Sequence, residues 1–369
     1  MKICYLANTA IPSSNASAIQ IVKMCESFSK LNNNVLLITT NVSDKKIFDF
    51  YNVRSKFQIT KLKKFKKFPL GIKYYLFSIL SILVSLKFKP DIYITRNFFT
   101  SFLLTILGKK NILELHHGIE MESRTVRLIL KIINFFNFKN LIMLLAITNN
   151  VKNYYKKKFG IKEQKFFVSP SGSSIQVNHK KKVSKDIKKL KIGYFGSLYK
   201  SRGINLILKL SQVDKDNDYF IFGNLKQFNN IKIKFYNQNL FINDYLPYKD
   251  VSKNILEMDL LLMPYEEKIV SAGNVGNIAK FTSPLKLFDY LACGKIIMSS
   301  QIKVLEETLK EKKNVIFVRN FRNIYAWKNE IKKIKFSYEK RIIISQNNIN
   351  LSKNFKMHKR AKKILDRIK

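Results

Sequence analysis

Apolar runs alternate with amphipathic segments along the first half of the chain. Residues 3–6 and 35–40 are short, continuous apolar runs, which are typical of parallel strands buried on both faces. Between them, apolar side chains recur at helical spacing, at Ala18, Ile21, Val22, Cys25 and Phe28. Residues 90–107, 111–120 and 141–160 continue the alternation. The pattern predicts a βαβ opening followed by further α/β units.

A second series of alternating elements begins near residue 190. Residues 190–210 have the pattern of a strand, a Gly-containing turn and a helix, and the apolar run 314–318 precedes a helical, Lys-rich C-terminus. The stretch 177–189 is highly charged and lacks apolar periodicity, so we expect it to link two domains. We predict an α/β protein with two Rossmann-like, doubly wound domains that face each other across a cleft.

The chain is strongly basic, with 68 Lys and Arg against 25 Asp and Glu and a formal net charge of +43. Attraction to phosphates, in nucleic acid or on an anionic membrane, is one explanation. A genome rich in A and T, whose codons favour Lys, Asn, Ile and Phe, is another. The basic residues are spread over the whole chain, and the sequence has no zinc-finger, RNA-recognition or helix-turn-helix pattern. We therefore expect no nucleic-acid partner.

Residues 61–90 combine lysines, aromatic residues and an apolar run at 74–86. Such a segment suits the interface of an anionic leaflet, although a basic loop before a buried helix has the same composition. The run is too short to span about 30 Å of hydrocarbon. No signal peptide precedes the first strand, and the three separated cysteines form no disulfide or zinc pattern. We expect a cytoplasmic protein, peripheral on the inner face of the plasma membrane.

Residues 281–295 have the pattern of a loop that turns into a helix. Ser283 is a suitable N-cap, and Pro284 suits the first helical position. A helix start with a lysine, Lys286, in its first turn favours an anionic ligand such as phosphate. Asp289, one turn later, is placed to accept hydrogen bonds from hydroxyl groups such as those of a ribose. The alternative is a capped surface helix with an ordinary Lys/Asp face.

The turn after the predicted strand at 191–195 is a second candidate phosphate site. Gly196 places a tight turn before a helix, with Lys200 and Arg202 beside it. Backbone amides and a guanidinium at such a turn can hold a diphosphate. The Gly-x-x-Gly spacing is not a dinucleotide fingerprint, and a solvated βα loop is the alternative.

Two polar loops of the first half are candidate ligand-binding sites. Ser13, Ser14 and Asn15 follow the first strand, on the side where parallel sheets bind ligands. His116 follows the apolar run at 111–115, where an imidazole can hydrogen-bond a ligand hydroxyl. A plain solvated loop and a structural histidine are the alternatives.

The residues SPLKLFDYLACGK (283–295), followed by IIMSSQIKVLEE, resemble the donor-site segment of the family-4 retaining glycosyltransferases, which have the two-domain GT-B fold. Asp289 falls at the ribose-binding carboxylate of that family. Phe281 falls where an earlier carboxylate usually stands, so that acid is missing here, and a subgroup of the family with an SPLK segment looks like this. The residues ELHHG (114–118) match the strand end that carries the acceptor-side histidine, here His116. Ser197 replaces the usual Arg of the phosphate turn, and Arg202 replaces a Lys.

The resemblance implies a donor site in the second domain and an acceptor site in the first. The implied donor-binding residues are Gly196, Ser197, Lys200, Arg202, Ser283, Pro284, Leu285, Lys286 and Asp289. The implied acceptor-binding residues are Ser13, Ser14, Asn15 and His116, and the implied catalytic residues are His116, Lys286 and Arg202. The implied domains are 1–178 on the acceptor side, a linker at 179–190, 191–340 for the nucleotide sugar, and a helical segment at 341–369 that packs back on the first domain.

The activity implied is that of a retaining glycosyltransferase. It moves a sugar from a nucleotide-diphosphate donor to a glycan or lipid-linked acceptor in the synthesis of a capsule, O-antigen or exopolysaccharide. We expect no metal or other cofactor, since cations and a helix dipole can stabilise the leaving diphosphate. An anionic membrane surface is a further expected partner. The alternative is a catalytically inactive GT-B-fold protein that binds nucleotide or glycan, because Phe281 and Ser197 stand in place of charged family residues.

Overall fold

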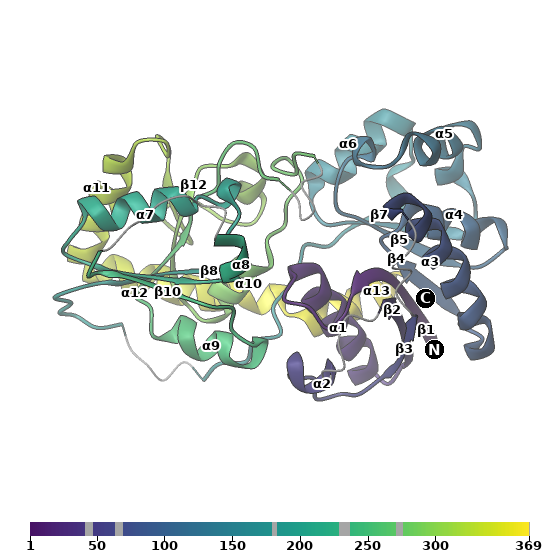
Figure 1. The fold of residues 1–369 in the computed structure, drawn as a ribbon, viewed down its shortest axis with the longest axis horizontal. Helices are drawn as coiled ribbons and strands as arrows, with labels where there is room; N and C mark the ends of the chain where they lie inside the picture. Colours follow the sequence, from purple (N-terminus) through teal and green to yellow (C-terminus); the bar gives the residue numbers. More distant parts are fainter. Residues whose placement is uncertain (41–46, 63–68, 179–182, 229–236, 271–275, 369) are drawn as a thin grey trace. The chain divides into compact units, whose positions relative to one another are not determined.

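The computed structural model contains two α/β domains, drawn in Figure 1. The structure describes residues 1–40, 47–62, 69–178, 183–228, 237–270 and 276–368. The first domain comprises Met1–Ser171, Phe281–Ser283 and Met357–Lys369, and the second comprises Gly172–Lys280 and Pro284–Lys356.

Within its described residues, the first domain has a parallel sheet of seven strands in the order β3-β2-β1-β4-β5-β6-β7. The strands are β1 (Lys2–Ala10), β2 (Asn34–Thr40), β3 (Gln58–Leu62), β4 (Ile92–Thr95), β5 (Asn111–Leu115), β6 (Leu141–Ala146) and β7 (Phe166–Val168). The chain passes from β1 outward to β3 and then returns to β4 on the other side of β1. The strand order therefore reverses between β1 and β4, and ligands bind at the carboxyl ends of strands beside such a switch point.

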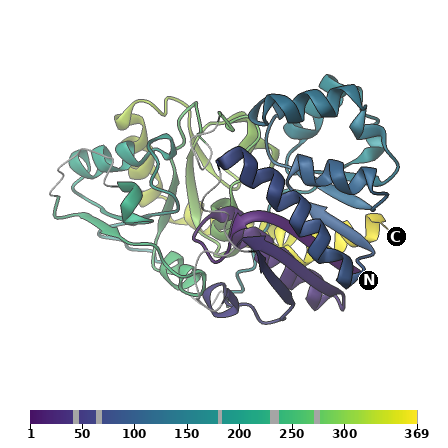
Figure 2. The ribbon, with the colours of Figure 1, turned by 45° about the vertical axis from the view of Figure 1, so that its right-hand side comes forward.

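Helices cover this sheet and contribute to its buried core. They are α1 (Ala16–Lys30), α2 (Ile47–Phe50), α3 (Leu70–Ser85), α4 (Phe98–Ile106), α5 (Arg124–Ile132), α6 (Asn149–Phe159) and α13 (Met357–Ile368). Figure 2 shows α3 in front of the strands and the yellow α13 behind them, where α13 packs against α1. The C-terminal helix thus belongs to the first domain, as the predicted fold implied, whereas residues 341–356 of the predicted segment 341–369 belong to the second domain.

The second domain repeats the plan. Its described residues form a parallel sheet of six strands in the order β10-β9-β8-β11-β12-β13, with a switch point between β8 and β11. The strands are β8 (Lys191–Phe195), β9 (Asp218–Phe222), β10 (Leu240–Asn243), β11 (Leu260–Met263), β12 (Ile296–Ser300) and β13 (Ile316–Val318). The helices are α7 (Ile204–Val213), α8 (Leu225–Phe228), α9 (Tyr248–Leu256), α10 (Leu285–Ala292), α11 (Ile324–Phe336) and α12 (Tyr338–Ser352). The prediction of two Rossmann-like domains is confirmed.

Helix α3 continues into a short 3-10 turn, η1 (Leu86–Phe88), and is longer than the apolar run predicted at 74–86. In the described part of the chain, residues 71–88 form the one helix that is long and apolar enough to cross a membrane, judged by length and composition alone. Only 28% of this segment is buried. The core helix of a soluble protein passes the same test.

Gly203 brings together the two loops that flank the switch point of the second sheet. It precedes α7, has a φ of 76°, and lies against Pro264, which follows β11. A Cβ at Gly203 would lie 1.7 Å from the carbonyl oxygen of Pro264. Only glycine allows this close approach in a left-handed conformation.

We predict that Gly203→Ala destabilises the protein more than Gly108→Ala. Gly108 has a similar φ of 71° but nothing within 4 Å of an added Cβ, so its substitution tests the backbone strain alone. We expect a loss of about 1 kcal/mol for Gly108→Ala and about 3 kcal/mol or more for Gly203→Ala. Urea unfolding followed by circular dichroism measures both. Equal losses would show that the two loops do not approach as closely as described.

Candidate functional site

A buried lysine side chain lies at the switch point of the second sheet. Lys286, in the first turn of α10, places its Nζ 3.7 Å from the ring centroid of Tyr194. This Nζ is buried and has no hydrogen-bond partner among the described residues. Gly196, which follows β8, provides the space: its φ is 145°, and a Cβ there would lie 2.8 Å from the Lys286 Nζ. The turn therefore leaves room for the lysine side chain, and the described residues place no anion beside it.

A second cation lies beside the first. The Arg202 Cζ and the Lys286 Nζ lie 5.6 and 5.7 Å from the ring centroid of Tyr265. Arg202 donates a weak hydrogen bond to the Val270 carbonyl, at 3.4 Å, and in the described part of the domain no carboxylate pairs with either cation. Burial, and then the charge of Arg202, hold the pKa of Lys286 well below its usual range. Two like charges in a partly buried site are costly unless an anion joins them.

The start of α10 adds backbone donors, but not in the way the sequence predicted. The helix begins at Leu285 with Pro284 at the N-cap position, and no side chain caps it. The prediction that Ser283 caps this helix is wrong. The Ser283 hydroxyl instead accepts a 3.0 Å hydrogen bond from the Ser171 N–H within the first domain. The N–H groups of Leu285 and Lys286 lie at the positive end of the helix, where an anion is stabilised.

The amide cradle predicted after β8 is only partly available. The Gly196 N–H donates to the Phe222 carbonyl at 3.0 Å, so it is already used within the sheet. Gly196 thus contributes space for Lys286 rather than a donor to a ligand. Ser197 is exposed, and Lys200 begins a 3-10 turn, η5 (Lys200–Arg202), although its side chain lies outside the described part of the structure.

Asp289 has partners within the second domain. Its Oδ1 accepts hydrogen bonds from the Ser173 hydroxyl at 2.6 Å and from the Tyr248 hydroxyl at 3.2 Å, and the residue is 5% exposed. The carboxylate thus ties the start of the domain and α9 to α10. Its predicted contact with a ribose stays a prediction.

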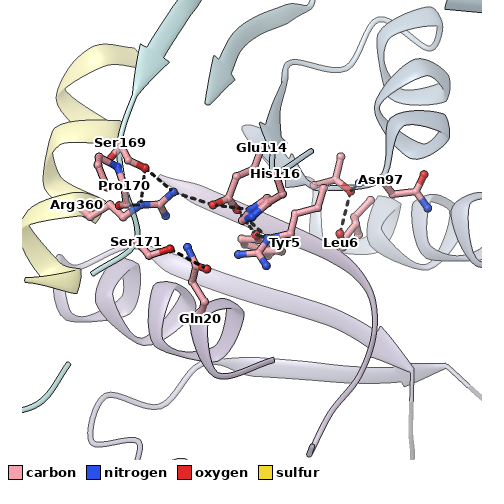
Figure 3. Close-up of polar contacts among 12 residues, drawn as sticks. Tyr5, Leu6, Gln20, Asn97, Glu114, His116, Ser169, Pro170, Ser171 and Arg360 are labelled. Atoms are coloured by element: carbon pink, nitrogen blue, oxygen red, sulfur yellow. Dashed lines mark hydrogen bonds and ion pairs between the residues drawn. The ribbon is translucent and has the colours of Figure 1, made fainter. Parts of the chain in front are cut away.

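The first domain has a polar cluster at the carboxyl ends of its central strands, shown in Figure 3. At its centre Glu114, 1% exposed, accepts hydrogen bonds from the Tyr5 hydroxyl at 2.7 Å, the Arg96 Nε at 3.0 Å and the Arg360 Nη2 at 2.7 Å. The Arg360 Nε also donates to the Pro170 carbonyl at 2.9 Å. One carboxylate therefore holds two guanidiniums, one following β4 and one from α13.

His116 borders this cluster. Its Nε2 lies 3.3 Å from the Glu114 Oε1 without hydrogen-bonding geometry, and its side chain is 23% exposed. Burial, and then the charge of Arg96, lower the pKa of His116 to about 4. The imidazole is therefore neutral near pH 7 and can both donate and accept a hydrogen bond.

The loop after β1 lies at the same edge of the sheet. The Ser13 N–H donates to the Tyr51 hydroxyl, and that hydroxyl donates to the Ser13 carbonyl, both at 2.7 Å. Ser14 is half-buried, and Asn15 is exposed at the N-cap position of α1 without a side-chain capping bond. Phe281, at the family's carboxylate position, packs edge-on against Tyr154 with ring centroids 5.3 Å apart.

The sequence interpretation missed Arg96, Tyr194 and Tyr265. The tyrosines lie in or directly after apolar strands and have the pattern of core residues. Arg96 interrupts an apolar stretch, and its place directly after a strand at a switch point was the available signal. Among the described residues, no group of three or more His, Cys, Asp or Glu is placed to hold a metal ion. Metal-independent catalysis stays a prediction.

Comparison with known proteins identifies the fold. The chain matches no model of a protein family, and no curated protein matches its sequence. Among solved structures it is similar to Anabaena HepE in complex with UDP, with 12% identity, a TM-score of 0.72, and coverage of 100% of this chain and 99% of that one. It is also similar to the sucrose-phosphate synthase of Thermosynechococcus elongatus, with 12% identity, a TM-score of 0.71, and coverage of 99% and 97%.

A third similar structure is WaaG, a glycosyltransferase involved in lipopolysaccharide biosynthesis. Its identity is 11%, its TM-score is 0.65, and 99% of this chain and 98% of that one are covered. At such identities the likeness concerns the fold alone. The chain therefore has the two-domain GT-B fold of these glycosyltransferases.

Proposed function

We propose that this protein is a retaining glycosyltransferase. Its donor is a nucleoside-diphosphate sugar, and its acceptor is a glycan or lipid-linked sugar in the synthesis of a surface polysaccharide. The observation that carries the proposal is the buried Lys286 ammonium, which lies beside Arg202 and has no partner among the described residues. A diphosphate would supply the negative charge that both cations lack. The UDP held by HepE makes UDP the first nucleotide to test.

In the proposed reaction, the bond between the sugar C1 and the diphosphate oxygen breaks, and a bond from C1 to the acceptor oxygen forms. The diphosphate leaves with the bonding electron pair, and one of its oxygens takes the proton of the acceptor hydroxyl. Because attack and departure occur on the same face of the sugar, the configuration at C1 is retained. Lys286, Arg202 and the start of α10 stabilise the growing negative charge. Neutral His116 orients the acceptor hydroxyl or the transferred sugar.

The alternative function is nucleotide or glycan binding without turnover, favoured by Phe281 and Ser197 at positions where the family carries charges. Incubation with UDP-sugars and candidate acceptors, followed by mass spectrometry, separates the two. Transfer to an acceptor supports the enzyme. Tight UDP binding with no transfer to any acceptor favours the binding protein.

We predict that Lys286→Met weakens UDP binding by about 10- to 100-fold, the loss expected for a charge-assisted hydrogen bond. Isothermal titration calorimetry with UDP, without added metal, measures the effect. Lys209→Met is the matched control, because it removes the same charge from an exposed position of α7 in the same domain. If both variants bind UDP equally well, the phosphate site is not at Lys286.

His116 gives a prediction about acid stability. Its pKa of about 4 in the folded protein lies below the ordinary value of about 6.5, so the unfolded chain binds more protons between these pH values. Stability is therefore lost as the pH falls through this window. We expect wild type to lose about 3 kcal/mol more than His116→Gln between pH 7 and pH 4. Urea unfolding at several pH values measures this, and parallel losses would show that His116 is not held neutral.

We also propose that the first domain docks on the anionic inner face of the plasma membrane. The buried side of α3 combines Phe77 and Ile82 with Ser78, Ser81 and Ser85, and further apolar residues line its outer side. Ile72, Ile79, Leu83 and Leu86 are between 43% and 55% exposed. A surface helix usually has a polar outer side, whereas that of α3 is apolar, and an apolar leaflet would cover it.

Neighbouring helices also have exposed apolar residues. Exposed apolar residues continue at the end of α4 and on α5, which pack in sequence beside α3, at Ile106, Leu107, Leu128 and Ile132. Exposed lysines accompany them, at Lys87, Lys89, Lys109, Lys110, Lys131 and Lys139. Lysines beside an apolar face complement anionic lipid headgroups. The predicted interfacial segment 61–90 includes residues 63–68, which lie outside the described residues.

We predict that the double variant Leu83→Glu, Ile132→Glu binds phosphatidylglycerol-containing vesicles about tenfold or more weakly than wild type, since charges would enter the acyl boundary. Co-sedimentation measures this binding, which should also weaken as salt is added. Ile343→Glu is the control, because Ile343 in the second domain is 54% exposed, like Leu83 at 55%. Equal binding by the double variant and the control would contradict this docking face.

A further inference from the structure

We propose that the first domain contains an anion site at Arg96 and that the acceptor carries a carboxylate or phosphate group. Identifying the anion as part of the acceptor rests on the proposed glycosyltransferase function. The anion site itself rests on the geometry of the first domain alone.

The position of Arg96 is the first argument. Arg96 directly follows β4, and the loop with Ser13 follows β1, so both flank the point where the strand order of the first sheet reverses. Open α/β sheets bind their ligands at this crevice. The second sheet has its buried, unpartnered cation, Lys286, at the equivalent point between β8 and β11. Each domain thus has a cation at its switch point.

The charge of the cluster is the second argument. Arg96 and Arg360 both bind Glu114, so one negative charge faces two positive ones. His116 is neutral near pH 7 and does not alter this balance. The described residues place no second carboxylate within ion-pair distance of either guanidinium. One positive charge is therefore left over in a site where Arg96 is only partly exposed, and an uncompensated charge there is costly.

Unused hydrogen-bond donors are the third argument. The Arg96 Nη2, the Arg360 Nη1 and the Gln20 Nε2 are buried and have no partner in the part of the chain that the structure describes. Figure 3 shows Gln20 reaching from α1 and Arg360 from α13 toward Glu114. Gln20 is joined to the same network, because its Oε1 accepts a 3.4 Å hydrogen bond from the Ser171 hydroxyl. Buried donors normally have partners, so three unused ones on residues of this network leave hydrogen bonds that a ligand can make.

The ligand must supply several acceptor oxygens and a negative charge, which a carboxylate or a phosphate does. Arg96 is the residue that meets it, since its side chain is 18% exposed whereas that of Arg360 is 3% exposed. Arg360 holds Glu114, which in turn binds the guanidinium of Arg96, and its unused Nη1 is a further donor of this cluster. A neutral sugar leaves the excess charge uncompensated, so the site favours a sugar acid or a sugar phosphate over it.

The test is calorimetric titration of the Lys286→Met protein, in which the donor site is disabled, with glucuronate, glucose 1-phosphate and glucose. We expect saturable binding of at least one anionic sugar and at least about tenfold weaker binding of glucose. Arg96→Gln added to this background should weaken anion binding about tenfold or more. Gln20→Glu should do the same, because it keeps an acceptor for Ser171 and adds a repelling charge. Arg124→Gln, which removes an exposed charge from the same domain, should have no effect.

The outcomes separate the two proposals. Binding of glucuronate alone identifies a carboxylate, and binding of glucose 1-phosphate alone identifies a phosphate. If neither binds, or if Arg96→Gln binds as well as Arg124→Gln, the anion site is wrong. If wild type binds no nucleoside diphosphate, the proposed donor site at Lys286 is wrong, but the proposed anion site at Arg96 is not affected.

Discussion

The candidate site of each domain is organised around cations for which the described residues supply too little negative charge. A protein interior normally pairs its charges, because an unpaired ion loses its hydration and gains little in return. Here the Lys286 ammonium lies against aromatic rings, and two guanidiniums share the single carboxylate of Glu114. Such an arrangement reduces the stability of the free protein. A ligand that brings the missing charge recovers that free energy as affinity, which is why both switch points favour anions.

Glu114 also fixes the position of the C-terminal helix α13 within the first domain. Arg360 reaches it from α13 across 246 positions of sequence and also donates to carbonyl groups that follow β7. The buried ion pair of Arg360 and Glu114 thus holds α13 at the carboxyl ends of the strands of the first sheet. Loss of Arg360 would leave Glu114 with Arg96 and Tyr5 as its direct hydrogen-bond donors. The C-terminal helix is therefore part of the polar cluster as well as of the fold.

The sequence was sufficient for the fold because strand and helix periodicity is local. Apolar runs such as 35–40 and the spacing of Ala18 to Phe28 predicted the βαβ opening, which the structure contains. It also pointed to Lys286, Arg202 and Gly196, which the structure brings together. The sequence could not show that the Gly196 N–H donates to the Phe222 carbonyl, or that the Ser283 hydroxyl accepts a hydrogen bond from the Ser171 N–H. Those contacts join residues far apart in the chain and leave no periodic trace.

Lys286 in the second domain and Arg96 in the first differ in how their charge responds to pH, which matters for a reaction with two substrates. A lysine changes its charge readily when buried, and the pKa of Lys286 is already lowered by its surroundings. A diphosphate beside it would favour the ammonium form, so donor binding and protonation of Lys286 are coupled. A guanidinium keeps its charge at every physiological pH, so Arg96 attracts an anion whether or not another ligand is present. Donor affinity should therefore depend on pH through Lys286, whereas the charge that Arg96 offers an anion should not.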